Sequence, residues 1–191
     1  MTQPQSHSLT DDDPMPAPVA PYAGGPIFLT GFMGCGKSTA GQALADLLGL
    51  PFIDLDIRIE AIANCAIADL IQLEGEERFR AIETEVLREA AGIGNAIIAS
   101  GGGVVTRPEN RELMRAAGIT VWLDTDFDLC WERIRQEEGT RPLAPDEATA
   151  RARFEQRRPL YGEAALRIDV DAAQAPEEIA GEILRRIGAE P

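Results

Sequence analysis

The stretch with the clearest chemical meaning is a glycine-rich run that ends in lysine and serine, Gly31-Phe32-Met33-Gly34-Cys35-Gly36-Lys37-Ser38. It fits the pattern G-x-x-x-x-G-K-[ST], in which backbone N–H groups surround phosphate oxygens and the lysine bridges the β- and γ-phosphates. The serine hydroxyl of this pattern takes a Mg²⁺ position. An apolar segment precedes the run and an amphipathic one follows it, which favours a phosphate loop over a glycine-rich turn that matches by accident.

The use of basic residues supports this interpretation. The chain contains 17 arginines and one lysine, and that lysine is Lys37. Everywhere else the sequence uses arginine for positive charge. A single lysine in this position indicates a site that needs a compact ammonium group.

A pair of carboxylates ends the second predicted strand, in Asp54-Leu55-Asp56. Open α/β sheets place their ligand crevice at such strand ends, and alternation along a strand points Asp54 and Asp56 to the same side. One carboxylate can hold Mg²⁺ through water, and the other can accept the proton of an attacking hydroxyl. The alternative for Asp56 is helix capping, since it precedes the helical segment that starts at Ile57.

Several further groups could complete a site. The triplet Gly101-Gly102-Gly103 follows the third strand and exposes backbone N–H groups, although a plain tight turn explains it almost as well. Arg80 lies on a helix of mixed charge, where a surface ion pair is the ordinary alternative. Residues 137–147 are rich in glycine and proline around Arg141, as in a mobile flap. A second basic cluster, Arg157-Arg158, lies at a helix end.

Short apolar strands that alternate with helices must position these groups, which predicts an α/β fold whose parallel sheet is covered on both faces. The predicted strands are residues 27–30, 52–55, 96–99, 120–123 and 166–170. The predicted helices are residues 37–48, stretches between 57 and 91, and residues 107–116, 126–136, 146–157 and 176–186. We expect one domain over residues 26–191. Residues 1–25, with five prolines and three consecutive aspartates, are expected to form a disordered tail.

Composition excludes other classes of function. The formal net charge of −14 argues against nucleic acid or an anionic membrane as partner. No apolar run is long enough to cross a bilayer, and the first basic residue is Lys37, so we expect a cytoplasmic protein. Three widely spaced cysteines predict neither disulfides nor a zinc site, and Cys65 and Cys130 are expected near the core. A single histidine, His7, excludes histidine-based catalysis if the tail is disordered.

Taken in order, these pieces resemble shikimate kinase, a small member of the phosphate-loop kinases related to nucleoside monophosphate kinases. The resemblance runs from about Ile27 to Ile187. It is carried by G-F-M-G-C-G-K-S-T, D-L-D, F-R-x-x-E from Phe79 to Glu83, G-G-G, R-P-L and R-x-P-L-Y. Two departures are Ala144, where the family's R-P-L-L has leucine, and an adenine-side arginine that could be Arg133 or Arg135.

The resemblance implies a three-layer fold with a five-stranded parallel sheet in 2-3-1-4-5 order and a mobile lid at about residues 137–147. It implies ATP-dependent phosphorylation of the shikimate 3-hydroxyl, a step of chorismate and aromatic amino-acid biosynthesis, by an enzyme that we expect to be a monomer. Lys37, Asp56 and Arg141 would be catalytic, and Ser38 and Asp54 would bind Mg²⁺. ATP would be bound by Gly34, Cys35, Gly36, Lys37, Ser38, Thr39 and Arg141. Shikimate would be bound by Asp56, Arg80, Gly101, Gly102, Gly103 and Arg157.

Two other functions are compatible with parts of the sequence. Another small-molecule kinase of the same fold, such as a gluconate kinase, would share the phosphate loop. The aspartate pair, the glycine triplet and the R-P-L flap together argue against it. A nucleotide-binding module without transfer activity would have no need for a base at Asp56 beside anion-pairing arginines.

Overall fold

The computed structural model describes residues 24–136 and 145–188. Within them, five strands form one sheet: β1 (Ile27–Thr30), β2 (Phe52–Asp54), β3 (Ile97–Ala99), β4 (Ile119–Thr125) and β5 (Leu166–Val170). The helices are α1 (Lys37–Leu48), α2 (Leu55–Ala63), α3 (Ile67–Glu74), α4 (Glu76–Ala91), the 3₁₀ turn η1 (Val104–Thr106), α5 (Pro108–Ala117), α6 (Phe127–Gln136), α7 (Glu147–Tyr161) and α8 (Pro176–Gly188). All but the last two residues of the predicted tail, and most of the predicted flap, lie outside the described residues.

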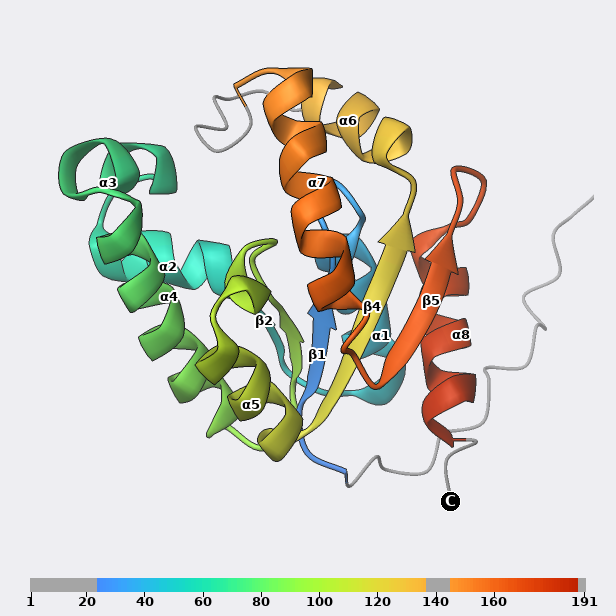
Figure 1. Ribbon diagram of the computed structural model, residues 1–191. Helices are drawn as coiled ribbons and strands as arrows, with labels where there is room; N and C mark the ends of the chain where they lie inside the picture. The colour runs from blue at the N-terminus through green and yellow to red at the C-terminus, as the bar shows by residue number, and fades with distance from the viewer. Residues whose placement is uncertain (1–23, 137–144, 189–191) are drawn as a thin grey trace, which may run out of the picture.

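The sheet has the order β2-β3-β1-β4-β5, and every neighbouring pair is parallel. This confirms the predicted fold class and strand order. Helices α1 and α8 pack together on one face, while α5 and α7 lie over the other face (Figure 1). The three layers leave β1 and β3 without any exposed side chain, and apart from Thr30 their residues are apolar.

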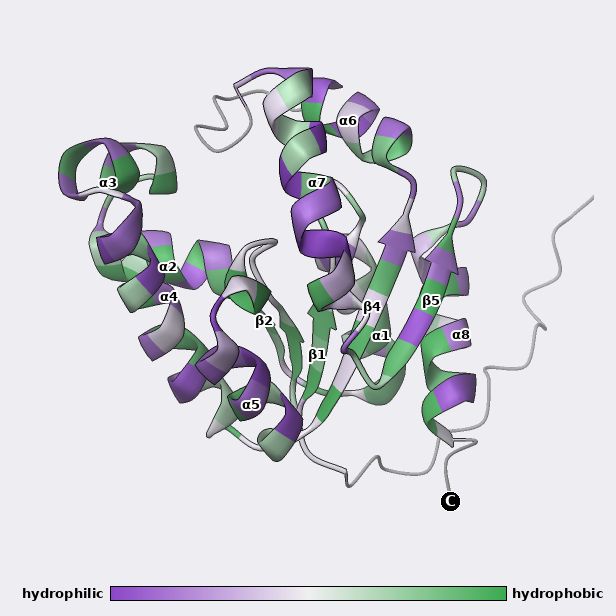
Figure 2. Ribbon diagram, in the orientation of Figure 1, coloured by the Kyte–Doolittle hydropathy of each residue, from purple (hydrophilic) through white to green (hydrophobic). Residues whose placement is uncertain are grey.

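Hydropathy follows the layers. The strands in the centre of the sheet are hydrophobic along their length, whereas the outer helices alternate polar and apolar faces (Figure 2). Cys130 is buried in this core and Cys65 packs half-buried against it, as predicted. None of the described helices is long and apolar enough to cross a membrane.

Most element boundaries lie within two residues of the prediction, and two differences bear on the site. Helix α7 continues past residue 157 to Tyr161, because Pro159 falls in its last turn, where a missing N–H costs only one intrahelical hydrogen bond. Strand β2 ends at Asp54 and α2 begins at Leu55, because the Asp54 side chain caps that helix. Asp56 therefore lies in the first turn of α2 and not on the strand.

Candidate active site

Strand register brings the chemically active loops to one edge of the sheet. Leu29 of β1, Ala99 of β3 and Asp54 of β2 form one row of paired residues. The chain leaves all three strands at nearly the same level, so the glycine-rich run after β1, the aspartates after β2 and the glycine triplet after β3 are neighbours. Ser100 fixes two of these segments together, since its N–H and its hydroxyl both donate to the Leu29 carbonyl.

The phosphate loop has a backbone that only glycine can supply at its tightest points. Gly34 has a φ of 76°, and a Cβ there would lie 2.6 Å from the Cys130 carbonyl oxygen. Gly36 is left-handed with a φ of 97° and is the N-cap of α1. Because the first N–H groups of a helix have no partner within the helix, α1 directs positive partial charge into this loop.

Lys37 extends back along this loop. Its ammonium group donates to the Gly31 and Phe32 carbonyl oxygens at 3.0 and 2.8 Å, and the residue is only 9% exposed. The Cys35 thiol is buried 3.5 Å from the same nitrogen, so Cys35 can meet a ligand only through its backbone. The Thr39 hydroxyl donates to the Gly36 carbonyl.

Ser38 and Asp54 offer oxygen ligands that fit Mg²⁺. The Ser38 hydroxyl donates to Asp54 Oδ2 at 2.6 Å, which places a hydroxyl and a carboxylate side by side at the start of α1. Proteins bind Mg²⁺ through one or two such groups together with substrate phosphates. Within the described residues, no group of three or more His, Cys, Asp or Glu gathers as a metal site.

The two aspartates have different tasks in the fold. Asp54 Oδ1 accepts the N–H groups of Asp56 and Ile57 at 3.0 and 3.4 Å, so the cap that the sequence offered to Asp56 belongs to Asp54. Strand alternation was therefore the wrong reason for placing both carboxylates together. They still line the same cavities, because the first turn of α2 directs Asp56 into the crevice.

Two cavities adjoin at this edge of the sheet, of about 480 and 500 Å³. The larger is bounded by the phosphate loop, α6 and the start of α8, and the other by the glycine triplet, α2, α3 and α4. Residues that line both are Met33, Ser38, Asp54, Asp56 and Gly102. A ligand in one cavity can thus meet a ligand in the other across Asp56.

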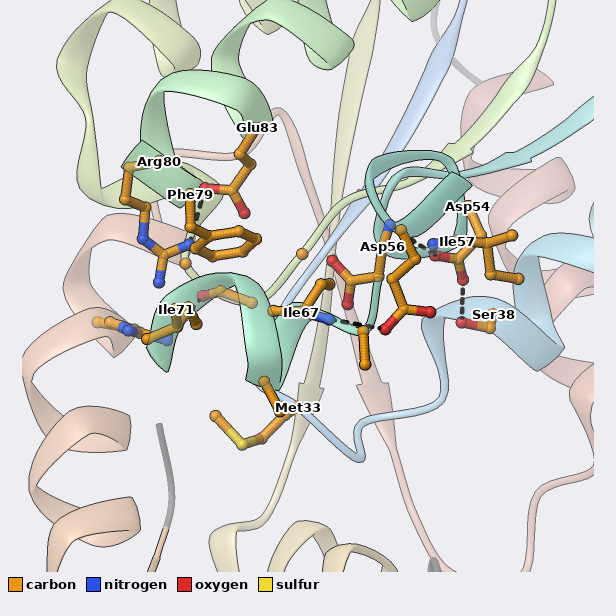
Figure 3. Close-up of a pocket in the computed structure, with 17 residues that line it drawn as sticks. Met33, Ser38, Asp54, Asp56, Ile57, Ile67, Ile71, Phe79, Arg80 and Glu83 are labelled. Atoms are coloured by element: carbon orange, nitrogen blue, oxygen red, sulfur yellow. Dashed lines mark hydrogen bonds and ion pairs between the residues drawn. The ribbon is translucent and has the colours of Figure 1, made fainter. Parts of the chain in front are cut away.

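A buried ion pair forms the far wall of the second cavity. Arg80 is 6% exposed, and its Nη1 donates to Glu83 Oε2 at 2.7 Å while Nη2 pairs with Glu76 at 3.2 Å. Figure 3 shows Arg80 and Glu83 on one side of the cavity and Asp54, Asp56 and Ser38 on the other. Burial acts to lower the pKa of Arg80, but Glu83 and Glu76 outweigh it and the pKa is raised. Arg80 is therefore a permanent cation here.

Glu83 is fully buried, and burial raises its pKa although Arg80 counteracts the effect. Its second oxygen, Oε1, has no hydrogen-bond partner within the described residues. A Cβ on Gly101 would lie 2.7 Å from that oxygen and 2.8 Å from Asp56 Oδ1, so both carboxylates converge on Gly101. The absence of a side chain at this position leaves the room between them.

Arg157 adds a second guanidinium from α7. It is 4% exposed and donates to the Gly102 carbonyl oxygen at 3.3 Å. Burial lowers its pKa, and the positive charges of Arg80 and Arg153 act in the same direction. Gly103 lies directly against Arg80, since a Cβ there would come within 2.3 Å of the guanidinium. Two buried guanidinium groups beside backbone amides form a site for a planar carboxylate.

The structure therefore brings together every predicted site residue except Arg141, which lies outside the described residues. Of the two arginines that the sequence left open, Arg133 contacts the phosphate loop through the Gly34 carbonyl at 3.2 Å and lines the larger cavity. Arg135 does neither. The sequence analysis assigned no role to Glu83, although its i,i+3 spacing from Arg80 on one helix was a usable signal. It also missed the apolar wall of the second cavity, formed by Ile57, Ile67, Ile71 and Phe79.

Comparison with known proteins agrees with this geometry. The family model described as shikimate kinase matches residues 33–188. A shikimate kinase from Symbiobacterium thermophilum is 42% identical over 166 residues, covering 84% of this chain and 95% of the relative. One from Synechococcus sp. (strain JA-3-3Ab) is 38% identical over 166 residues, with 85% and 87% covered.

A solved structure is similar over the same length. The shikimate kinase from Acinetobacter baumannii in complex with shikimate superposes with a TM-score of 0.83 and is 37% identical. The alignment covers 86% of this chain and 93% of that one. Since a family model spans most of the sequence and relatives match along nearly their whole length, the chain belongs to the shikimate kinase family.

Proposed function

We propose that this protein transfers the γ-phosphoryl group of MgATP to the 3-hydroxyl of shikimate, giving shikimate 3-phosphate and ADP. The observation that carries the proposal is the shared wall of the two cavities. A phosphate loop bounds one cavity, two buried guanidinium groups bound the other, and Asp56 lines both. That arrangement suits transfer between two bound anions, one with a triphosphate and one with a carboxylate and a hydroxyl.

On the nucleotide side, the N–H groups of residues 34–39 would bind the phosphates at the start of α1. Lys37 would exchange its carbonyl partners for β- and γ-phosphate oxygens. Ser38 and Asp54 would hold Mg²⁺, which when bound neutralises charge on the phosphate oxygens. Arg133, beside Gly34, is the better placed of the two candidate arginines to lie near the nucleotide base.

On the acceptor side, Arg80 and Arg157 would pair with the shikimate carboxylate, and the backbone of residues 101–103 would line the pocket. The carboxylate would then be held at one end of the cavity, with the hydroxyl groups directed toward Asp56. Asp56 would orient the 3-hydroxyl and accept its proton as the oxygen attacks phosphorus. Phosphoryl transfer needs little covalent assistance, so positioning and charge neutralisation supply most of the rate.

Arg141 remains part of this proposal as the lid residue that would reach the transferring phosphoryl group. The proposal also includes the single catalytic domain, the monomeric state and the cytoplasmic location expected from the sequence. Sedimentation velocity and cell fractionation test the last two.

An acceptor panel in a coupled ADP-release assay tests the function. ATP and Mg²⁺ are supplied with shikimate, with gluconate or with no acceptor, and the Lys37→Met variant controls for contaminating phosphatases. We expect ADP release only with shikimate and only from the unsubstituted protein. Turnover on gluconate without turnover on shikimate would favour the gluconate kinase alternative. ATP binding without acceptor-dependent release would favour a nucleotide-binding module.

A further inference from the structure

Beyond the residues that touch the two substrates, we propose that Tyr161 is a positioning residue for the acceptor. Its hydroxyl fixes the Gly102–Gly103 peptide so that the Gly103 N–H is presented to the substrate carboxylate. The inference rests on the proposed function and deepens it. It gives a role to the tyrosine that ends the R-x-P-L-Y segment of the sequence.

The contact is short and well enclosed. Tyr161 is 1% exposed, and its hydroxyl donates to the Gly102 carbonyl oxygen at 2.5 Å. Its ring stacks on Trp122 of β4, with centroids 6.3 Å apart and an interplanar angle of 30°. Burial raises the pKa of Tyr161, so the hydroxyl keeps its proton and remains a donor at neutral pH. The Tyr161 ring is therefore fixed by Trp122 of the sheet, while its hydroxyl fixes the Gly102 carbonyl of the glycine triplet.

The Gly102 carbonyl and the Gly103 N–H belong to the same planar peptide group, so a contact that fixes one also fixes the other. A trans peptide points its C=O and its N–H in opposite directions, and the structure contains no cis peptide bond among the described residues. Because the Gly102 carbonyl is directed at α7, the Gly103 N–H faces away from α7. Gly103 itself lies against the Arg80 guanidinium, which a Cβ at this position would meet. The N–H and Arg80 can thus bind one carboxylate together.

Gly102 also packs closely against the phosphate loop. A Cβ on Gly102 would lie 3.2 Å from the Met33 backbone nitrogen and 3.4 Å from the Gly31 carbonyl oxygen. Gly102 is therefore wedged between the phosphate loop and α7. Releasing its carbonyl would let the glycine triplet shift relative to the nucleotide site.

Tyr161 also helps to hold Arg157 in place. The two side chains are one turn apart on α7 and are hydrogen-bonded to each other. Both also donate to the Gly102 oxygen, Arg157 at the longer distance of 3.3 Å. With the hydroxyl present, the partly buried Gly102 carbonyl is satisfied by a short hydrogen bond. Without it, the guanidinium becomes the remaining donor, and the carbonyl competes with the substrate carboxylate for the same N–H groups.

The Tyr161→Phe variant removes the hydroxyl and keeps the ring on Trp122. Loss of one neutral hydrogen bond, worth about 1 kcal/mol, corresponds to about a fivefold rise in the KM for shikimate. We expect that rise with the KM for ATP unchanged within about twofold, because Lys37 and the phosphate loop are untouched. Amide hydrogen exchange of residues 101–106 in the absence of ligand should become faster.

Thr120→Val is the matched control. Its hydroxyl accepts the Ala165 N–H at 3.0 Å in the same region, so the variant also loses one shielded hydrogen bond but leaves Gly102 alone. We expect a lower Tm and no change in the KM for shikimate. A Tyr161→Phe enzyme with the shikimate KM of the unsubstituted protein, or with loop exchange no faster than in Thr120→Val, would overturn the inference.

The kinetic measurement and the hydrogen-exchange measurement together separate this inference from the proposed function. If the unsubstituted protein shows no shikimate-dependent ADP release, the proposed function fails on that result alone. The exchange measurement needs no substrate and still decides whether Tyr161 holds the loop. Unchanged exchange in Tyr161→Phe would then reject the positioning role as well.

Discussion

Gly103→Ala is the substitution that most sharply separates the acceptor site from the fold. Gly103 has a φ of −103° and a ψ of −7°, a backbone conformation that alanine can adopt. The added methyl group therefore strains nothing in the backbone. It does collide with Arg80, because Cβ would lie 2.3 Å from Nη2, 2.4 Å from Nη1 and 2.5 Å from Cζ.

The size of the collision sets the expected effect. Ordinary contact begins at 3.4 Å, so the guanidinium must retreat by about 1 Å. Retreat disturbs the 2.7 Å pair with Glu83 and moves the cation away from the position of the substrate carboxylate. A misplacement of about 1 Å can lower kcat/KM by about 100-fold, equivalent to about 2.7 kcal/mol. Most of the loss should appear in the KM for shikimate.

The assay is coupled ADP release with shikimate and ATP varied in turn, together with thermal unfolding. The KM for ATP should stay within about twofold, and Tm should fall by no more than about 4 °C, or about 1 kcal/mol. Gly181→Ala in α8 is the control, because a Cβ there meets nothing within 4 Å. A Gly103→Ala enzyme with a normal KM for shikimate and a normal kcat would refute the placement of Arg80 in the acceptor site.

Three more predictions follow from the carboxylates. Asp56→Asn should lower kcat by about 100-fold or more with a smaller change in either KM, measured by coupled ADP release, and near-normal turnover would exclude its role as base. Asp54→Asn keeps the cap of α2 but should raise the Mg²⁺ concentration needed for half-maximal rate. Asp54→Ala should in addition lose about 1 kcal/mol of stability, because it also removes the helix cap. If the unsubstituted protein and both Asp54 variants needed the same Mg²⁺ concentration, Asp54 would not be a Mg²⁺ ligand. Because the pKa of Glu83 is raised above its ordinary 4.5, its contribution favours folding below pH 4.5 and is lost as the pH rises through the folded value. Chemical denaturation at a series of pH values from 4.5 upward should show the free energy of unfolding of the unsubstituted protein falling relative to that of Glu83→Gln. A difference between the two proteins that stays the same at every pH would contradict this prediction.

The parts of the fold that local chemistry specifies were predictable. Helix α1 begins and ends where the sequence analysis placed it, between Gly36 and Gly49, because left-handed glycines flank it at both ends. Strand β1 is equally well predicted, since four apolar or small residues precede a glycine with positive φ. The phosphate loop joins these two elements, so its position followed from them.

Boundaries set by a side chain were harder to predict. Phe52, Ile53 and Leu55 look like parts of one continuing strand, but Asp54 accepts two backbone N–H groups and starts a helix instead. The sequence offered two aspartates as the cap, and nothing local distinguishes them. In the structure Asp54 also accepts a hydrogen bond from Ser38, which lies 16 residues earlier in another element.

Burial and long-range contacts account for what remained unpredicted. Taken singly, Arg80 favoured a surface ion pair, and only the family resemblance assigned it to the shikimate site. Packing of α4 against the glycine triplet buries it. Tyr161 stood in a recognisable segment, but its partner Gly102 is 59 residues away in the chain. Neither a period nor a local spacing encodes such a contact.

The most direct measurement of the central claim is the fate of the γ-phosphoryl group, followed by ³¹P nuclear magnetic resonance in a mixture of protein, MgATP and shikimate. The account predicts that the γ-phosphorus signal disappears in equal amount to the growth of one phosphomonoester signal, coupled to the proton on C3 of the acceptor. Release of inorganic phosphate at the same rate with and without shikimate would contradict it.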